Sequence, residues 1–198
     1  SKEKAEQLYN ELGGEDSNHS YFELNVTDHD SIENCVKNII EKYKKIDVLV
    51  NNAGVITWKP FEKQTTDEIR KQVEANLIGT LNITQMVLPY LKKQPESVIV
   101  NLGSTAAKQG YAETSVYCAT KFGVRGFTQG LAQELPENVR IYLVNPGLTA
   151  TAMTENRGVP ASEVAQIIVN TAKEKYSIAS GGDIDILGET HAYVKGFK

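Results

Sequence analysis

The 198-residue chain has few of the residues that mark disulfide-rich, metal-binding or nucleic-acid-binding proteins. Its two cysteines, Cys35 and Cys118, lie far apart, and none of its three histidines has another histidine or a cysteine at ligand spacing. We therefore expect free thiols, a cytoplasmic location and no metal site. The 21 basic and 25 acidic residues give a net charge of −4 without charged blocks, so we expect no nucleic-acid partner.

Long hydrophobic runs are also missing. No apolar stretch approaches the roughly 18 residues that a membrane-spanning helix needs, and no basic, apolar, small-residue leader is visible. The apolar fraction of 40% is nevertheless that of an ordinary globular protein. The sequence therefore predicts one globular domain, residues 1–198, with no membrane partner.

The glycines lack the spacing of a phosphate-binding turn. None of the 15 glycines is followed by another two positions later, whereas a dinucleotide site needs such a turn so that backbone N–H groups can approach the pyrophosphate. The chain also begins with a helical pattern over Ser1–Leu12. Either the protein binds no dinucleotide, or a βαβ unit of about 30 or more residues precedes the given sequence.

Short runs of β-branched residues alternate with longer amphipathic segments along the rest of the chain. This alternation is typical of an α/β fold with a doubly wound parallel sheet. The predicted strands are Tyr21–Leu24, Ile46–Val50, Ser97–Leu102, Arg140–Val144 and Ile184–Leu187. The predicted helices are Asp28–Tyr43, Thr66–Lys92, Ser115–Leu135 and Ala161–Lys175.

Tyr117 is the only one of the nine tyrosines with a lysine, Lys121, four positions later. Residues at this spacing share one face of a helix, so the ammonium can lie near the phenol. A phenol that acts as an acid or base at neutral pH needs its pKa lowered by about 3 units, roughly 4 kcal/mol. One ammonium about 4 Å away can supply this. The alternative is an exposed tyrosine and lysine on a surface helix.

Three segments that follow predicted strands carry small or polar residues. Open α/β sheets bind ligands at the carboxyl ends of their strands, so these segments are candidate binding loops, although each is also compatible with an ordinary turn. They are Asn51-Asn52-Ala53-Gly54, Gly103-Ser104 and Pro146-Gly147 with the nearby Thr149 and Thr151. Asn76 lies in an apolar helical pattern, where a buried amide needs hydrogen-bond partners; a structural core asparagine explains it equally well.

Taken together, these motifs resemble the short-chain dehydrogenase/reductase family in their order and spacing, from about residue 20 to residue 188. The resemblance implies a Rossmann-like doubly wound sheet of seven strands. Because only five strands are predicted, we expect the first two strands of the family fold and its glycine-rich turn to lie outside the given sequence.

The family resemblance also implies a reaction and a cofactor. The implied reaction is hydride transfer between NAD or NADP and a small-molecule ketone or secondary alcohol, with a 3-oxoacyl thioester as one candidate. Tyr117 would be the general acid/base, Ser104 would hydrogen-bond the reacting oxygen, Lys121 would lower the phenol pKa and hold the ribose, and Asn76 would position a water in a proton path. The implied cofactor-binding residues are Asn25, Val26, Asn52, Ala53, Gly54, Tyr117, Lys121, Pro146, Gly147, Thr149 and Thr151.

The surroundings of the implied site are less specific. Trp58, Tyr111, Leu148 and Met153 are candidates for the substrate pocket wall, and ordinary packing is the alternative for each. The resemblance implies a homodimer or homotetramer paired through the two long helices. Two competing hypotheses are a nucleotide-binding regulatory or scaffold protein without catalysis, and a nonfunctional fragment that begins at Ser1.

Overall fold

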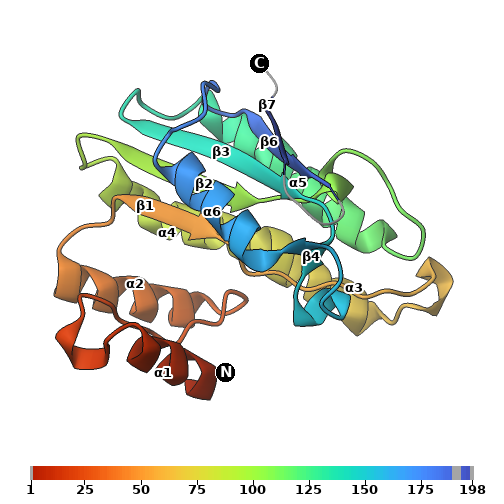
Figure 1. Ribbon diagram of the computed structural model, residues 1–198, viewed down its shortest axis with the longest axis horizontal. Coiled ribbons are helices and arrows are strands. Elements are labelled where there is room, and N and C mark those ends of the chain that lie inside the picture. The colour runs from red at the N-terminus through yellow and green to blue at the C-terminus, as the bar shows by residue number, and fades with distance from the viewer. Residues whose placement is uncertain (1, 189–192, 197–198) are drawn as a thin grey trace.

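The computed structural model describes residues 2–188 and 193–196, and its centre is a five-stranded sheet (Figure 1). The strand order is β1-β2-β3-β6-β7, in which the first four strands are parallel and β7 is antiparallel to β6. A separate pair, β4 and β5, forms a small second sheet. The strands are β1 (Val48–Asn51), β2 (Ser97–Leu102), β3 (Val139–Pro146), β4 (Thr149–Ala150), β5 (Val159–Pro160), β6 (Asp183–Leu187) and β7 (Tyr193–Gly196).

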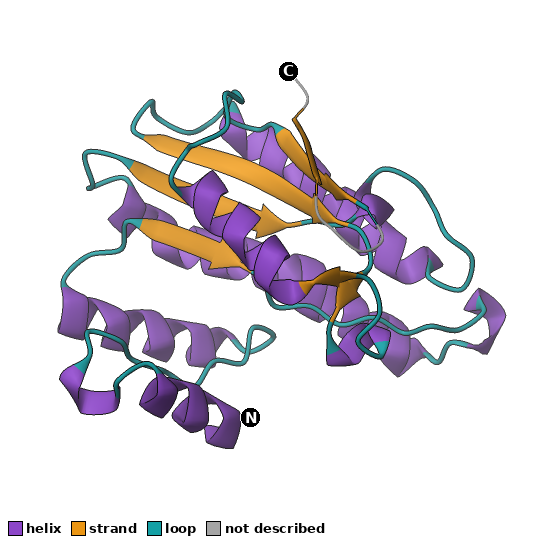
Figure 2. Cartoon of the chain, viewed as in Figure 1, coloured by secondary structure: helices purple, strands orange, loops and turns teal. Residues whose placement is uncertain are grey.

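Helices cover both faces of this sheet, with α6 on one face and α4 and α5 on the other (Figures 1 and 2). The doubly wound architecture expected from the sequence is therefore confirmed. The helices are α1 (Lys2–Glu11), α2 (His29–Tyr43), α3 (Thr66–Val73), α4 (Gly79–Leu91), α5 (Ser115–Ala132) and α6 (Ala161–Ala172), with short turns η1 (Gly14–Asp16), η2 (Phe61–Lys63), η3 (Glu74–Ile78), η4 (Thr105–Ala107) and η5 (Ala152–Thr154). Within the described residues, none of the helices has the length and apolarity to cross a membrane.

Strand β2 is apolar on both sides because both of its faces are covered. All six of its residues are buried. Val98, Val100 and Leu102 belong to the core cluster under α6, whereas Ile99 belongs to the cluster shared with α2 and α4. The continuous apolar run in the sequence is thus the expected signature of a central parallel strand.

The helix starts follow local capping chemistry. The Asp28 carboxylate accepts hydrogen bonds from the backbone N–H groups of Asp30 and Ser31 at the start of α2. Thr65 and Glu68 form a capping box at the start of α3. The single helix predicted over Thr66–Lys92 is interrupted by η3, a π-helical turn between α3 and α4.

The predicted strand Tyr21–Leu24 is wrong, since this segment pairs with no strand within the described residues. Extended backbone becomes a strand only when a neighbour completes its hydrogen-bond ladder. Tyr21 instead contacts α1, where its hydroxyl donates to Glu6 at 2.9 Å. The fifth strand is β7, to which the sequence patterns had assigned no structure.

Buried polar side chains of β1 and β2 form a hydrogen-bonded chain that links α4 to α5 along one face of the sheet. The Asn51 amide donates to the Thr84 hydroxyl at 2.9 Å and to Asn101 Oδ1 at 2.8 Å. Asn101 Nδ2 in turn donates to the Thr128 hydroxyl at 2.9 Å. Asn101 and Thr128 are completely buried, so these hydrogen bonds replace water that the groups cannot reach.

Replacing Asn101 with alanine should lower the free energy of unfolding by about 3 kcal/mol, because buried groups of Asn51 and Thr128 lose their partner. Urea denaturation followed by circular dichroism measures this loss. The control is Asn38→Ala at an exposed position of α2, which should change stability by less than about 0.5 kcal/mol. Equal losses in the two variants would contradict the proposed contribution of the network.

Candidate functional site

The candidate site lies where β1, β2 and β3 end. Parallel pairing places Asn51 beside Asn101 and Leu102 beside Val144, so the segments that follow these strands leave the sheet at the same edge. The loops predicted from sequence therefore lie together, at the position where α/β sheets bind ligands.

Tyr117 and Lys121 reach this edge from α5. Lys121 is 5% exposed, its Nζ donates to the carbonyl oxygen of Leu102 at 2.7 Å, and it lies 5.6 Å from the centroid of the Tyr117 ring. Ser104 follows β2, and its side chain lies within hydrogen-bonding reach of the Tyr117 phenol. The structure thus brings Ser104, Tyr117 and Lys121 together, and the alternative of an exposed Tyr–Lys pair is wrong for Lys121.

Burial controls the protonation of this cluster. It raises the pKa of the Tyr117 phenol, while the hydrogen bond from Ser104 acts in the opposite direction. Burial also lowers the pKa of Lys121 to about 8. The pKa of the phenol is thus raised in this arrangement, whereas the sequence led us to expect a lowered value, because burial disfavours the phenolate.

Asn76 lies in the π-helical turn and is 1% exposed. Its Oδ1 accepts from the backbone N–H of Val55 at 2.7 Å, and its Nδ2 donates to the Val55 carbonyl at 2.8 Å and the Thr120 hydroxyl at 3.1 Å. The amide therefore fastens the loop after β1 to α5. Both of its hydrogens are engaged, so the side chain has no free donor for the expected water.

A cleft of about 180 Å³ lies beside the end of β1. Asn52, Ala53 and Val26 line it together with Gly79. A side chain at Gly79 would come within 2.9 Å of the Val26 carbonyl oxygen, so glycine permits the close approach of these two segments. Asn25 is not among the residues that line the cleft. Its Oδ1 accepts hydrogen bonds from the backbone N–H and the hydroxyl of Thr27.

The other implied cofactor residues are distributed around the same edge. A Cβ on Gly54 would lie 3.8 Å from Lys121 Nζ, which places this glycine next to the lysine. Pro146 is the last residue of β3, and the N–H of the following Gly147 donates to the Ile186 carbonyl at 3.1 Å. The Thr149 hydroxyl donates to the Gly147 carbonyl at 3.2 Å, and Thr151 caps η5. These residues therefore lie near the edge, but the Thr149 hydroxyl serves the local turn.

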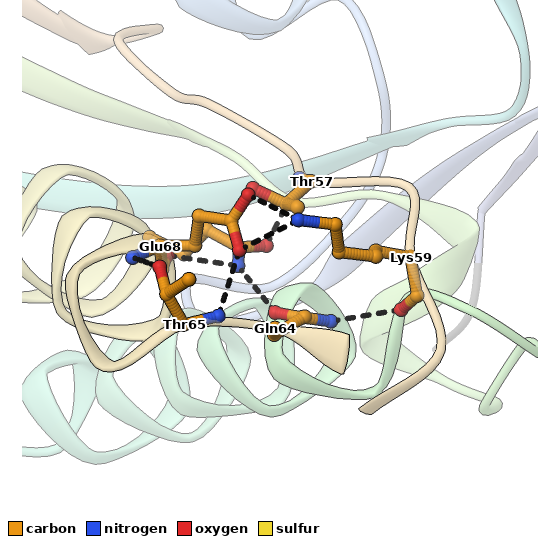
Figure 3. Close-up of polar contacts among 6 residues, drawn as sticks. Thr57, Lys59, Gln64, Thr65 and Glu68 are labelled. Atoms are coloured by element: carbon orange, nitrogen blue, oxygen red, sulfur yellow. Dashed lines mark hydrogen bonds and ion pairs between the residues drawn. The ribbon is translucent and has the colours of Figure 1, made fainter. Parts of the chain in front are cut away.

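A polar brace, which the sequence patterns did not reveal, holds the loop that carries Trp58. Figure 3 shows Lys59 paired with Glu68 of α3, at 2.8 Å, while the backbone N–H of Thr57 donates to Gln72 at 3.2 Å. The Lys59 N–H also donates to the Glu113 carbonyl at 2.9 Å. The loop is thereby tied to α3 and to the segment that leads into α5, with Trp58 still 55% exposed.

Within the described ranges 2–188 and 193–196, no group of three or more histidine, cysteine or acidic side chains is arranged to hold a metal ion. The lysine, arginine and aspartate side chains near the site form ion pairs with one another, such as Lys108 with Asp185 at 2.7 Å.

Comparison with known proteins shows extensive similarity. The family model described as short chain dehydrogenase matches residues 1–160. The 3-oxoacyl-[acyl-carrier-protein] reductase FabG of Thermotoga maritima is 36% identical over 95% of this chain and 83% of its own length. Two further curated relatives are each 34% identical to this chain. The chain spans only 57% of the length of one and 51% of the length of the other.

Solved structures agree with this similarity. A short-chain dehydrogenase/reductase from Brucella melitensis, described as a glucose/ribitol dehydrogenase, superposes with a TM-score of 0.78 at 28% identity, covering 84% of this chain and 74% of that one. A chain from Shigella flexneri 2a, described as a short chain dehydrogenase complexed with NADP, has a TM-score of 0.69 at 28% identity, with 77% and 64% covered.

Gly103 should not tolerate a side chain, because a Cβ there would lie 2.0 Å from Asn145 Oδ1. Gly103→Ala should lower the free energy of unfolding by about 2 kcal/mol through overpacking. Gly110→Ala, in the loop before α5 where a Cβ meets no described atom within 4 Å, should change stability by less than about 0.5 kcal/mol. Urea denaturation compares the two variants, and a Gly103→Ala variant as stable as wild type would contradict the geometry.

The lowered pKa of Lys121 should make stability depend on pH. The folded value is about 8 and the ordinary value is 10.5, so the unfolded chain binds more protons between these values and stability rises with pH there. The slope is at most about 1.4 kcal/mol per pH unit. In urea denaturation, the free energy of unfolding of the wild type should increase relative to that of Lys121→Met from pH 8 to pH 10. Parallel curves would show that the lysine is not perturbed.

Proposed function

The chain belongs to the short-chain dehydrogenase family of NAD- or NADP-dependent oxidoreductases, and we propose that Tyr117 is its proton donor and acceptor in the interconversion of a ketone and a secondary alcohol. The observation that carries this proposal is the meeting of Ser104, Tyr117 and Lys121 at the end of β2. A bound nicotinamide cofactor supplies or accepts the hydride.

The phenol carries its proton at neutral pH. Burial raises its pKa, so Tyr117 stays protonated until a carbonyl oxygen beside it gains negative charge. Ser104 is oriented for the same oxygen: its Oγ accepts from the Ala106 N–H at 3.1 Å, which leaves the hydroxyl hydrogen available for donation. Two donors on one oxygen stabilise the developing alkoxide.

Lys121 and the loop after β1 would hold the cofactor. The lysine is buried beside Gly54, where its ammonium can bind ribose hydroxyls. Asn52 and Ala53 would line the nucleotide cleft, together with Val26 but without the Asn25 side chain. Pro146, Gly147, Thr149 and Thr151 would border the nicotinamide end.

The substrate class rests on similarity and on exposed apolar residues. The relative from Thermotoga maritima is a 3-oxoacyl-[acyl-carrier-protein] reductase, which supports a 3-oxoacyl thioester as the substrate here. Four exposed apolar or aromatic side chains in the loops near the site could contact an acyl chain. They are Trp58, Tyr111, Leu148 and Met153.

We place the whole protein in the cytoplasm as a single-domain homodimer or homotetramer, without nucleic-acid or membrane partners. Support for self-association comes from α5 and the turn before α4. Phe122 and Ile78 are 44% and 41% exposed there, and within the part of the chain that the structure describes no atom lies within 4 Å of a Cβ built on Gly126 or Gly130. Such a face lets two helices approach closely.

Replacing Tyr117 with phenylalanine in the whole protein should lower kcat at least about 100-fold, because the proton donor is lost while the ring still packs. Consumption of NADPH or NADH with a 3-oxoacyl thioester measures turnover, and cofactor fluorescence checks binding. The control is Tyr43→Phe at the end of α2, where the exposed tyrosine hydroxyl donates to the Asn18 carbonyl at 3.1 Å; its kcat should change less than about threefold. Undiminished turnover in Tyr117→Phe would refute the proposal, whereas a wild-type protein that binds the cofactor but turns over no substrate would favour a binding protein without catalysis.

A further inference from the structure

Ser104 is held from behind by a side chain of the neighbouring strand. Asn145, near the end of β3, is completely buried. Its Oδ1 accepts a hydrogen bond from the backbone N–H of Ser104 at 3.2 Å. Gly103 allows this contact, because any larger residue there would overlap the amide oxygen.

The Asn145 amide has a second partner that determines its orientation. Asp185 is its direct neighbour across the β3–β6 pair, and Asn145 Nδ2 donates to Asp185 Oδ1 at 3.0 Å. An ionised carboxylate can only accept hydrogen bonds. The NH₂ group must therefore face Asp185, so the oxygen faces the Ser104 N–H. A flipped amide would direct two donors at each other.

A lysine ammonium pairs with this buried carboxylate. Asp185 is 5% exposed, and its Oδ2 accepts from Lys108 Nζ at 2.7 Å. Asp183, two residues earlier on β6, also pairs with Lys108, at 3.2 Å, and with Arg125, at 2.7 Å. Asp183 makes no hydrogen bond to Asn145. It therefore shares the charge environment of Asp185 but not its link to the candidate site.

Buried ion pairs contribute little net stability, since apolar residues of similar volume often replace them without loss. The burial of Asp185 is thus poorly explained by packing alone. The Asp185 carboxylate does fix one hydrogen-bonding pattern. It accepts from Lys108 and from the Asn145 NH₂ group, so the Asn145 oxygen is left to accept from the Ser104 N–H.

We propose that Asp185 is a positioning residue for the reaction: it orients the Asn145 amide, which holds the Ser104 backbone so that the serine hydroxyl meets the reacting oxygen. This inference rests on the proposed role of Ser104. Asp185 does not touch the substrate and acts only through Asn145.

The variant Asp185→Asn tests this role with almost no change in volume. An amide at 185 can donate as well as accept, so the orientation of Asn145 is no longer unique. We expect kcat to fall at least about tenfold with KM changed less than about twofold, and hydrogen exchange of the Ser104 amide, measured by NMR, to accelerate at least about tenfold. The matched control is Asp183→Asn, which should keep kcat and Ser104 exchange within about twofold.

The double variant Asn145→Asp/Asp185→Asn provides a rescue. The carboxylate at 145 accepts from Ser104 and from the amide at 185, whose oxygen then accepts from Lys108, so every donor again has one acceptor. We expect kcat and Ser104 exchange to return to within about threefold of wild type.

Three results would overturn the inference: unchanged kcat and exchange in Asp185→Asn, an equal loss in Asp183→Asn, or no rescue in the double variant. A wild-type protein without turnover would refute the proposed function instead. The exchange rates of the Ser104 amide in the same four proteins would still decide whether Asp185 holds this backbone.

Discussion

The carboxyl end of β2 is where the sheet, the helix α5 and the candidate site depend on one another. The Gly103 N–H donates to the Val144 carbonyl at 2.8 Å, which extends the pairing with β3 to the last residue before Ser104. The preceding carbonyl, of Leu102, accepts from Lys121 at 2.7 Å. The register of this one strand therefore sets the position of the serine and of the lysine relative to it, and a small displacement would separate groups that must act on one oxygen.

Much of this arrangement could be predicted because it depends on local patterns. The apolar run Ser97–Leu102 gave the bounds of β2 without error, since burial on both faces leaves a continuous signal in the sequence. The helix predicted to begin at Asp28 corresponds to α2, because the Asp28 side chain caps its first turn. The Tyr117–Lys121 spacing likewise needed only the periodicity of a helix to place both residues on one face of α5.

The remaining features depend on contacts between distant segments. The segment Tyr21–Leu24 has the composition of a strand, but composition cannot supply a pairing partner. Asn145 and Asp185 meet only because β3 and β6 pair in one register. The signal for them was the alternation of Asp183 and Asp185 with buried isoleucines in β6, which shows charges in a central strand but not the groups they face. The pKa of the Tyr117 phenol was also misjudged from sequence. An assumed distance and dielectric omit the burial of Tyr117 and Lys121, which depends on the packing of distant segments.

The central claim is that this edge of the sheet supports direct transfer of hydrogen between a nicotinamide and a carbonyl carbon. The most direct measurement uses reduced nicotinamide cofactor with both hydrogens at C4 replaced by deuterium and a 3-oxoacyl thioester as the substrate. The 3-hydroxyacyl thioester product is analysed by mass spectrometry and NMR. The account predicts one deuterium on the carbinol carbon of every product molecule, with the hydroxyl hydrogen taken from solvent. Product with no deuterium on that carbon would contradict it.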